Sequence, residues 1–206
     1  TDSAYSNFAQ SIAMAVWGDG TGKVGVIGSV TATTDGVITL ANINDITNFE
    51  YGQSFQAAQT VGGALRNSGA SAVISGIDRD LGTITFTGTI TGMAAGDTLF
   101  LAGDNSGSST LLRMSGVQAW VPTSAPSATP FFGVVRTDDV TRLGGLRFNG
   151  TGNNYEELFV AGLSRLARDG GSPTHIFLNF IDWASLKISL GSKVETEYMQ
   201  MGAIGF

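Results

Sequence analysis

Residues 18–25 read GDGTGKVG, a glycine-rich stretch that separates two different sequence patterns. The segment before it, residues 3–17, has large apolar side chains three or four positions apart, the spacing of one face of an α-helix. These side chains form one stripe: Tyr5, Phe8, Ile12 and Val16. After the stretch, apolar and polar residues alternate, which is typical of β-strands. The glycine stretch therefore decides the fold, because a helix must end there and a sheet must begin.

The same stretch contains the pattern G-x-G-x-x-G at Gly20, Gly22 and Gly25. Dinucleotide-binding proteins place this pattern after a strand and before a helix, so that the positive helix end faces the phosphates. Here the order is reversed, and the nearest helix end is the negative one. Val24 also stands where a phosphate-binding loop needs Ser or Thr. We therefore predict a structural turn without a cofactor, with Gly18 as the left-handed residue that ends the helix.

The next part of the chain predicts six short strands rich in Thr, Val, Ile and Phe, separated by turns that contain Gly or Asp. They are 24–30, 36–42, 53–60, 71–78, 83–88 and 98–103. Their number and spacing predict a small closed barrel or a sandwich. The aromatic residues Phe49, Tyr51 and Phe55 belong to this part, and we expect them in its core rather than on a contact surface.

The last part of the chain mixes helices and strands, so the fold class is α+β. We expect a helix over 155–169, a strand over 174–180, a helix over 180–189 and a strand over 197–206. Asn154 and Asn179 stand where N-cap residues belong. The first of these helices should bury one apolar face: Leu158, Phe159, Leu163 and Leu166.

Composition argues against several functions. The formal net charge is −6 with only 11 Lys and Arg residues, which disfavours a protein that wraps nucleic acid. Cysteine is absent, which excludes disulfides and thiolate metal sites. His175 is the only histidine, and no nucleophile–base set accompanies it. Turn carboxylates such as Asp78 lack a calcium-loop spacing. We therefore predict no catalytic, metal or cofactor-binding residue, and we expect Trp120 and Trp183 to be core or interface anchors.

Several segments, in their order, resemble the major capsid protein of tailed bacteriophages. Residues 11–28, SIAMAVWGDGTGKVGVIG, are similar to the junction where the family's long spine helix meets a glycine turn. Residues 114–122, MSGVQAWVP, are similar to the segment that precedes its axial domain. Residues 173–186, PTHIFLNFIDWASL, resemble a strand–helix unit of that domain, with Phe180 in place of the usual proline. Residues 202–206, GAIGF, resemble the start of a later strand.

The resemblance implies a fold and a division of the chain. Residues 1–28 would be the spine helix and its turn, 29–105 an inserted β-domain, and 106–206 part of the axial domain. Because the family's fold has parts before and after these, we expect the sequence to be a piece of a longer chain. The implied structural and assembly residues are Tyr5, Phe8, Ile12, Gly18, Gly20, Gly22, Trp120 and Trp183.

The resemblance also implies a structural function. Copies would pack as pentamers and hexamers into an icosahedral shell around DNA that they do not bind specifically, with decoration or scaffold proteins as further partners and no membrane. The location would be the virion, and the host cytoplasm during assembly. The low share of charged residues, 14% against ~25% in average proteins, fits surfaces that other subunits cover.

Three other interpretations stay open. An encapsulin-like bacterial shell shares the capsid fold, although an inserted β-domain favours a phage. A β-rich binding module, for example for carbohydrate, would need exposed aromatic residues on 24–103. An enzyme with a nucleotide cofactor would show a shift in melting temperature when nucleotide is added.

Overall fold

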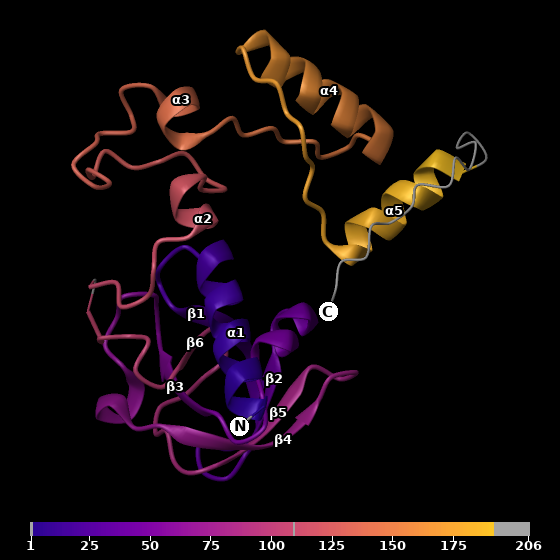
Figure 1. The fold of residues 1–206 in the computed structure, drawn as a ribbon. Coiled ribbons are helices and arrows are strands. Elements are labelled where there is room, and N and C mark those ends of the chain that lie inside the picture. Colours follow the sequence, from indigo (N-terminus) through magenta and orange to yellow (C-terminus); the bar gives the residue numbers. More distant parts are fainter. Residues whose placement is uncertain (1, 109, 192–206) are drawn as a thin grey trace. The chain divides into compact units, whose positions relative to one another are not determined.

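The computed structural model describes residues 2–108 and 110–191, and it confirms a mixed α+β fold (Figure 1). The chain divides into two compact units, Thr1–Gly145 and Leu146–Phe206. The first unit contains a long N-terminal helix, a closed β-barrel and two short helices, and the described part of the second contains two helices. Each unit is described separately below.

The predicted N-terminal helix is present as α1, Asp2–Trp17, and the chain then turns directly into strand β1, Lys23–Val30. The order of helix, glycine turn and strand is therefore as predicted. The expectation that Gly18 is the left-handed residue that ends the helix is wrong. Gly18 still donates its N–H to the Met14 carbonyl, but the left-handed residues are Gly20 (φ 86°) and Gly22 (φ 74°). The helical hydrogen-bond pattern thus runs to Gly18, and the chain changes direction only after it.

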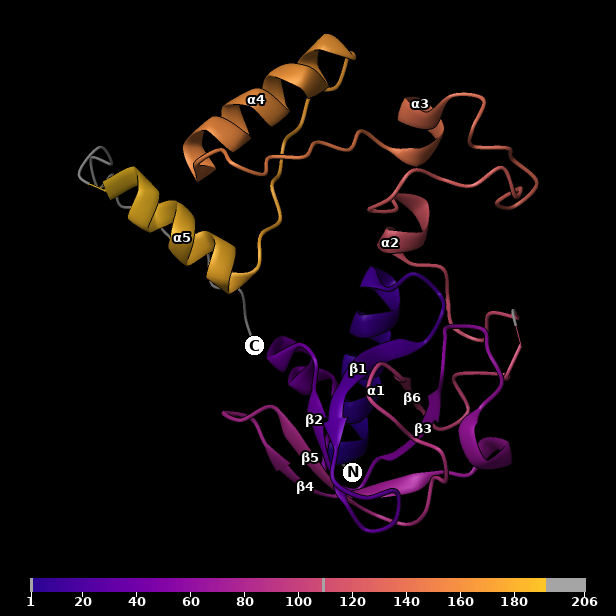
Figure 2. The same cartoon turned by 180° about the vertical axis from the view of Figure 1, so that it is seen from behind.

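All six predicted strand segments contain a strand, and the sheet closes into a barrel rather than a sandwich. Besides β1, the strands are β2 Val37–Leu40, β3 Ser54–Ala58, β4 Ala72–Asp78, β5 Thr83–Thr87 and β6 Thr98–Leu101. They pair antiparallel in the order β1-β2-β5-β4-β3-β6, and β6 returns to β1 (Figure 2). Short 3-10 helices η1, Ile43–Asn48, and η2, Arg66–Gly69, lie between the strands.

Glycines in the strands help the barrel to close. The register shifts between Lys23 and Gly25, between Ile27 and Ser29 and between Ile74 and Gly76. Such bulges bend a strand and increase its twist, which is what a small barrel needs. Gly28 lies in the second bulge, where a Cβ atom would stand 3.1 Å from the backbone of Ala41. Some of the chain's 29 glycines therefore serve the curvature of the strands.

The core of the first unit is the barrel interior. Alternate residues of β5 point inward, so Ile84 and Phe86 are buried while Thr85 and Thr87 are exposed. Phe49 and Phe55 are core residues as predicted, and Phe55 packs edge-on against Phe86 with ring centroids 5.5 Å apart. Tyr51 is the exception, because its ring is exposed in a turn before β3.

An ion pair with a buried carboxylate and a partly exposed guanidinium ties η2 to the barrel. Asp97 is 2% exposed, and its carboxylate accepts two hydrogen bonds from Arg66, of 2.9 Å from Nε and 2.7 Å from Nη2. The same carboxylate accepts a 3.0 Å bond from the Ala94 N–H. Three donors therefore satisfy a carboxylate that water cannot reach, as burial of a charge requires.

The first unit continues beyond the barrel through α2, Val117–Trp120, and α3, Val140–Gly144. The barrel strands run from Lys23 to Leu101, so β1 starts inside the segment 1–28 that was expected to belong to the spine helix and its turn. The division of the chain by contacts falls at Gly145 rather than near residue 105.

The second unit holds the two helices predicted from the sequence, α4 Tyr155–Arg168 and α5 Phe180–Leu190. Both N-caps are as predicted: the Asn154 side chain accepts a bond from the Glu157 N–H, and Asn179 accepts one from Asp182. The expected strand over 174–180 is wrong, because residues 171–179 have no regular structure and lack a strand partner among the described residues. The expected strand over 197–206 lies outside the described residues.

The second unit has no buried core among its described residues. None of residues 146–191 is buried. The expected buried face of α4 is at most half-buried, and Leu163 is exposed. On α5 the exposed apolar residues are Phe180, Ile181, Trp183 and Ile188. Helices in proteins draw most of their stability from packing of an apolar face, and the described residues of this unit supply little of it.

Replacing Arg66 with Ala should destabilise the barrel strongly, because it leaves the Asp97 carboxylate buried without a cation. The expected loss in the free energy of unfolding is about 3–5 kcal/mol, measured by urea denaturation. Glu50→Gln is the control, since Glu50 and Arg79 form an exposed 3.1 Å pair that should be worth less than about 1 kcal/mol. Equal losses in the two variants would contradict the structural role of the buried pair.

Candidate assembly surfaces

The glycine turn between α1 and β1 is built by side-chain bonds to its own backbone. The Asp19 carboxylate accepts bonds from the Thr21 N–H (2.9 Å) and the Thr21 hydroxyl (2.5 Å). The Thr21 hydroxyl oxygen in turn accepts a 3.3 Å bond from the Lys23 N–H. The acidic side chain and the negative end of α1 both disfavour an anion here. The turn therefore redirects the backbone between the two elements.

Arg113 connects this turn, the helix and the barrel exit. Its guanidinium donates a 2.6 Å bond to the carboxylate of Asp104, which follows β6. It also donates to the Ser11 hydroxyl (2.8 Å) and carbonyl (3.3 Å) on α1. The side chain is largely buried, and a Cβ atom on Gly22 would lie 3.4 Å from its Cγ. One cation thus holds two segments that are about a hundred residues apart in sequence.

Two further contacts fix α1 against the rest of the unit. Gln10 donates a 3.0 Å bond to the Thr47 carbonyl of η1. Gly116 lies against the end of the helix, where a Cβ atom would collide with the carbonyl oxygens of Ala15 and Val16. The half-buried side of α1 that faces its own unit therefore combines polar Gln10 and Ser11 with Met14 and Ala15.

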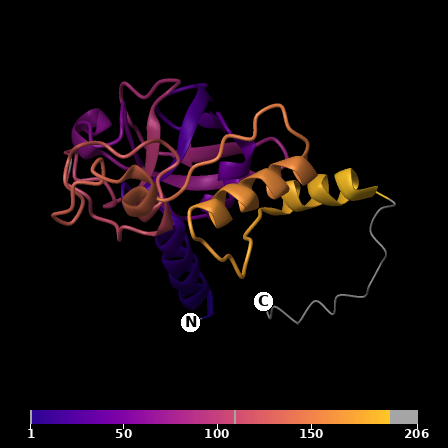
Figure 3. The same ribbon diagram turned by 90° about the horizontal axis from the view of Figure 1, so that it is seen from above.

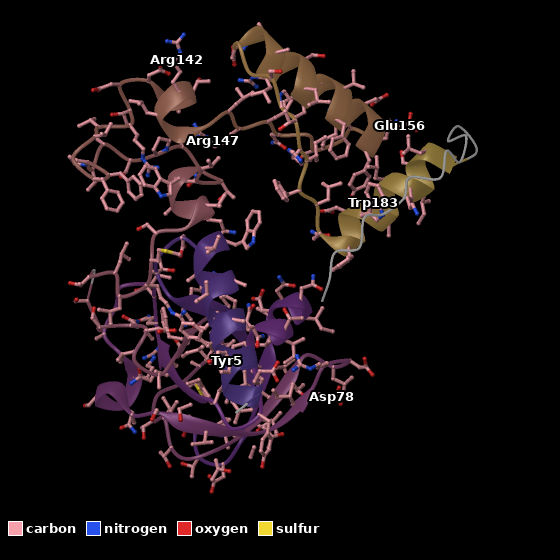
Figure 4. The ribbon with its side chains drawn as sticks, viewed as in Figure 1. Tyr5, Asp78, Arg142, Arg147, Glu156 and Trp183 are labelled. Carbon is pink, nitrogen blue, oxygen red and sulfur yellow. The ribbon has the colours of Figure 1, made fainter. Side chains whose placement is uncertain are left out.

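The apolar stripe of α1 faces solvent instead. Tyr5 is 76% exposed and Phe8 65%, and Ile12 and Val16 are exposed as well. Figure 3 shows the N-terminal half of α1 projecting beyond the barrel, and Figure 4 marks Tyr5 on this helix. An amphipathic helix normally turns its apolar side inward. In this unit the orientation is reversed, which leaves a large apolar face uncovered.

A second exposed apolar feature is an aromatic cluster after α2. The rings of Trp120 and Phe132 are parallel within 2° at a centroid distance of 5.5 Å, and Phe131 packs edge-on against both. The Trp120 indole donates a 3.2 Å bond to the Ser115 carbonyl. Arg136 lies 4.2 Å from the Phe131 ring centroid and donates a 2.8 Å bond to the Ala119 carbonyl. The cluster is therefore held from both sides, although Trp120 is 54% exposed and Phe132 73%.

The tip of this cluster has an unfavourable backbone conformation. Phe131 and Val134 exchange two backbone hydrogen bonds, of 2.9 and 3.1 Å, across a two-residue turn. Both central residues have positive φ, 49° for Phe132 and 82° for Gly133, as a type I′ turn requires. For a residue with a Cβ atom this conformation costs about 1–2 kcal/mol. Strain that keeps a large apolar ring exposed is typical of functional positions.

The second unit has an apolar groove between α4 and α5. Its volume is about 650 Å³. The lining residues are Glu156, Phe159, Val160, Ile176, Leu178, Asn179, Phe180, Trp183, Leu186 and Leu190. Figure 4 shows the labelled side chains of Glu156 and Trp183 where the two helices face each other. A 3.3 Å bond from the Tyr155 hydroxyl to the Asp182 carboxylate joins the starts of the two helices.

A polar hollow lies beside the glycine turn, and Asp45 is one of its lining residues together with Lys23 and Gln118. Burial raises the pKa of the Asp45 carboxyl above its ordinary value, and the charge of Lys23 partly offsets this effect. Asn42 donates a 3.3 Å bond to the same carboxylate. One weak donor and one nearby cation are not enough to compensate for the lost hydration.

Other polar residues have local structural partners. The Asp78 carboxylate accepts bonds from the backbone of Asp80 and Leu81 in a turn. His175 is exposed, and a ring nitrogen lies 2.9 Å from the Thr174 hydroxyl. Within residues 2–108 and 110–191, no group of His, Asp and Glu side chains could hold a metal ion. The helices of the same ranges are too short or too polar to cross a membrane.

The structure thus brings the candidate residues into separate groups. Tyr5, Phe8 and Ile12 share the exposed face of α1; Gly18, Gly20 and Gly22 form the turn; Trp120 belongs to the aromatic cluster and Trp183 to the groove. Sequence reasoning missed Arg113 and Phe132. The sequence FFGV at 131–134 was the available signal for the second, because Gly at a turn between apolar residues predicts a hairpin.

Comparison with known proteins gives no relative: no family model, curated protein or solved structure matches this chain.

Replacing Arg113 with Gln should loosen α1 from the barrel, since it removes charged hydrogen bonds to Ser11 and Asp104. Such bonds contribute about 1.5–3 kcal/mol, so amide hydrogen exchange in α1 should become roughly ten- to a hundredfold faster, with the β5 amides unchanged. Arg165→Gln, a change at an exposed arginine of α4, is the control. Unchanged exchange in α1 would show that other contacts hold the helix.

Replacing Asp45 with Asn should change the pH dependence of stability. The folded state holds the Asp45 proton more tightly than the unfolded chain, so this group stabilises the fold at low pH, and the contribution is lost as the pH rises through the raised pKa. The variant should therefore melt above the native chain at about pH 7, and the difference should shrink toward about pH 4. Asp80→Asn corrects for the lost charge. A pH-independent difference would refute the assignment.

Proposed function

We propose that this chain is a structural subunit that assembles with copies of itself, as the major capsid protein of a tailed bacteriophage does. The observation that carries the proposal is the orientation of α1: its stripe of Tyr5, Phe8, Ile12 and Val16 faces solvent, while the opposite side packs on its own unit through hydrogen bonds from Gln10 and to Ser11. A face of this kind is stable in water only when another surface covers it. Other copies of the chain supply that surface.

The second unit supports the same proposal. Residues 146–191 include no buried side chain, yet α5 exposes four large apolar residues. Obligate assemblies have interfaces that resemble a protein core cut in half and exceed ~2,000 Å². A subunit with incompletely buried helices and few charges has the surface that such an interface needs. In the capsid interpretation these surfaces join pentamers and hexamers into a shell around DNA, in the virion and earlier in the host cytoplasm.

The role of the barrel in this proposal is that of an inserted domain. Its aromatic residues Phe49, Phe55, Phe86 and Phe100 are buried, and Tyr51 is exposed in a turn. Recognition of a sugar uses exposed rings with polar neighbours, and one ring gives little surface for it. The barrel therefore supports the assembly proposal better than the alternative of a β-rich binding module.

Assembly is tested directly by electron microscopy and light scattering of the concentrated chain, alone and extended by flanking sequence. Capsomer rings or closed particles are expected. A chain that stays monomeric at high concentration in both forms would overturn the proposal.

Placing a charge on the exposed stripe should block assembly without unfolding the subunit. Phe8→Glu and Ile12→Glu are expected to abolish rings or particles in electron microscopy, because burying an unpaired carboxylate is costly. Both positions are exposed, so the stability of the monomer should change by only about 0.5 kcal/mol. Leu81→Glu is the control, since Leu81 is equally exposed but lies in the β4–β5 turn. Assembly that tolerates both helix variants would exclude the stripe as a contact.

A further inference from the structure

The turn before α4 contains the chain's one asparagine that is followed by glycine, Asn149–Gly150. We propose that Asn149 is a site of spontaneous covalent modification. Its side-chain amide cyclises onto the Gly150 nitrogen, releases ammonia and leaves aspartate or isoaspartate at this position. The inference is independent of the proposed self-assembly, because it uses only contacts within residues 149–158.

The reaction is an intramolecular acyl transfer. The Gly150 backbone nitrogen attacks Cγ of Asn149 and the Cγ–Nδ2 bond breaks, so that ammonia leaves with the hydrogen that the Gly150 nitrogen gives up. The product is a cyclic succinimide, and nothing is oxidised or reduced. Water then opens the ring. Cleavage at Cγ restores the normal backbone with an aspartate side chain, and cleavage at the backbone carbonyl carbon leaves isoaspartate, whose main chain runs through Cβ and Cγ.

Thr151 activates the side-chain amide of Asn149 for this attack. Its N–H donates a 3.0 Å hydrogen bond to Asn149 Oδ1, and its hydroxyl donates a 2.6 Å bond to the same oxygen. Negative charge develops on Oδ1 as the nitrogen attacks, so donors that already point at this oxygen stabilise the transition state, as an oxyanion hole does. The bonds also fold the side chain back along its own backbone, which restricts the search for the attacking geometry.

Gly150 supplies an unhindered nucleophile. Because glycine has no Cβ atom, the approach to its nitrogen is open. The fold also requires glycine at this position, since a Cβ atom would collide with the Leu158 side chain on α4. The Gly150 carbonyl accepts a 3.0 Å bond from the Asn153 N–H, which closes the turn. The packing of the turn on α4 therefore imposes the residue that makes Asn149 reactive.

Water has access to the reacting groups. Asn149 and Thr151 are exposed, and Asn149 lines a second hollow, of about 470 Å³, together with Tyr155 and Asp182. Ammonia can therefore leave, and water can enter for the hydrolysis of the ring.

Two other asparagines precede a small residue, serine, and serve as internal references. Asn105 is buried. Asn67 donates a 3.2 Å bond from its side-chain nitrogen to the Thr89 carbonyl. Neither is followed by glycine, so both should react much more slowly than Asn149.

The products change both the charge and the backbone of the turn. Each adds one negative charge to a chain whose formal charge is −6. Isoaspartate also lengthens the main chain before Gly150 by one carbon atom. The close packing of Gly150 on Leu158 and the bond from Asn153 then cannot both be kept. The start of α4 should therefore loosen as the protein ages.

Ageing of the purified chain tests the proposal. After incubation in mildly alkaline buffer, peptide mapping by mass spectrometry should detect loss of ammonia at Asn149, followed by the net exchange of NH₂ for OH. Enzymatic methylation should mark isoaspartate in the same peptide. Asn67 and Asn105 should remain largely unchanged. Equal conversion at the three asparagines overturns the inference.

Thr151→Val separates the effect of the fold from that of the Asn-Gly pair alone. The variant loses the hydroxyl donor but keeps the N–H and the shape of the side chain. Conversion at Asn149 should slow about fivefold to tenfold, the effect of one hydrogen bond on a rate. In urea, conversion should also slow, and the native chain and the variant should react equally. A folded variant that reacts at the native rate, or a native chain that reacts faster in urea, overturns activation by the turn.

Asn149→Ser is the control for the effect on α4. The serine hydroxyl can still accept a bond from the Thr151 N–H, but it cannot cyclise. Amide hydrogen exchange in the first turns of α4 should become faster as the native chain ages and should stay constant in the variant. An equal rise in both chains would show that Asn149 does not control the start of the helix.

Discussion

The hydrogen bonds that Arg113 makes to both α1 and the end of the barrel set the orientation of α1. That orientation decides which side chains of α1 face solvent. The guanidinium reaches Asp104 at the end of the barrel and Ser11 on the helix together, so the helix cannot rotate about its axis without breaking a charged bond. Gly116 allows the chain to lie directly against the last turn of the helix, because a Cβ atom there would collide with the Ala15 and Val16 carbonyl oxygens. The apolar stripe is consequently held away from the barrel, so its side chains add no stabilisation by burial within the chain.

The two units differ in their roles in folding and in the proposed association. The barrel has a continuous buried core that contains Ile38, Phe49 and Leu99, together with an ion pair whose carboxylate is fully bonded. It can be stable without neighbours. The α4–α5 unit keeps its apolar residues at the surface and depends on what covers them. Under the proposed function, such a chain can stay folded through its barrel before assembly and still gain free energy when its exposed helices are covered.

Local sequence signals predicted local structure well. The alternation of Ile84, Thr85 and Phe86 predicted a strand and its inward face, and Asn154 and Asn179 predicted two helix starts, because these features depend on neighbours in the chain. Features set by distant contacts were not predictable in this way. The face of α1 depends on Arg113, and the strand expected over 174–180 needs a pairing partner that its own residues cannot supply. The stacking of Phe132 on Trp120 depends on a hairpin that brings the rings together.

Closure of the barrel limits how copies of this chain can join. Because β6 pairs with β1, the sheet leaves no free edge whose N–H and carbonyl groups could recruit a strand from another molecule. Backbone-templated stacking of the kind that leads to fibrils is thereby suppressed at high protein concentration. In the proposed assembly, association is therefore left to side chains, whose contacts can form, break and re-form without a continuous backbone template.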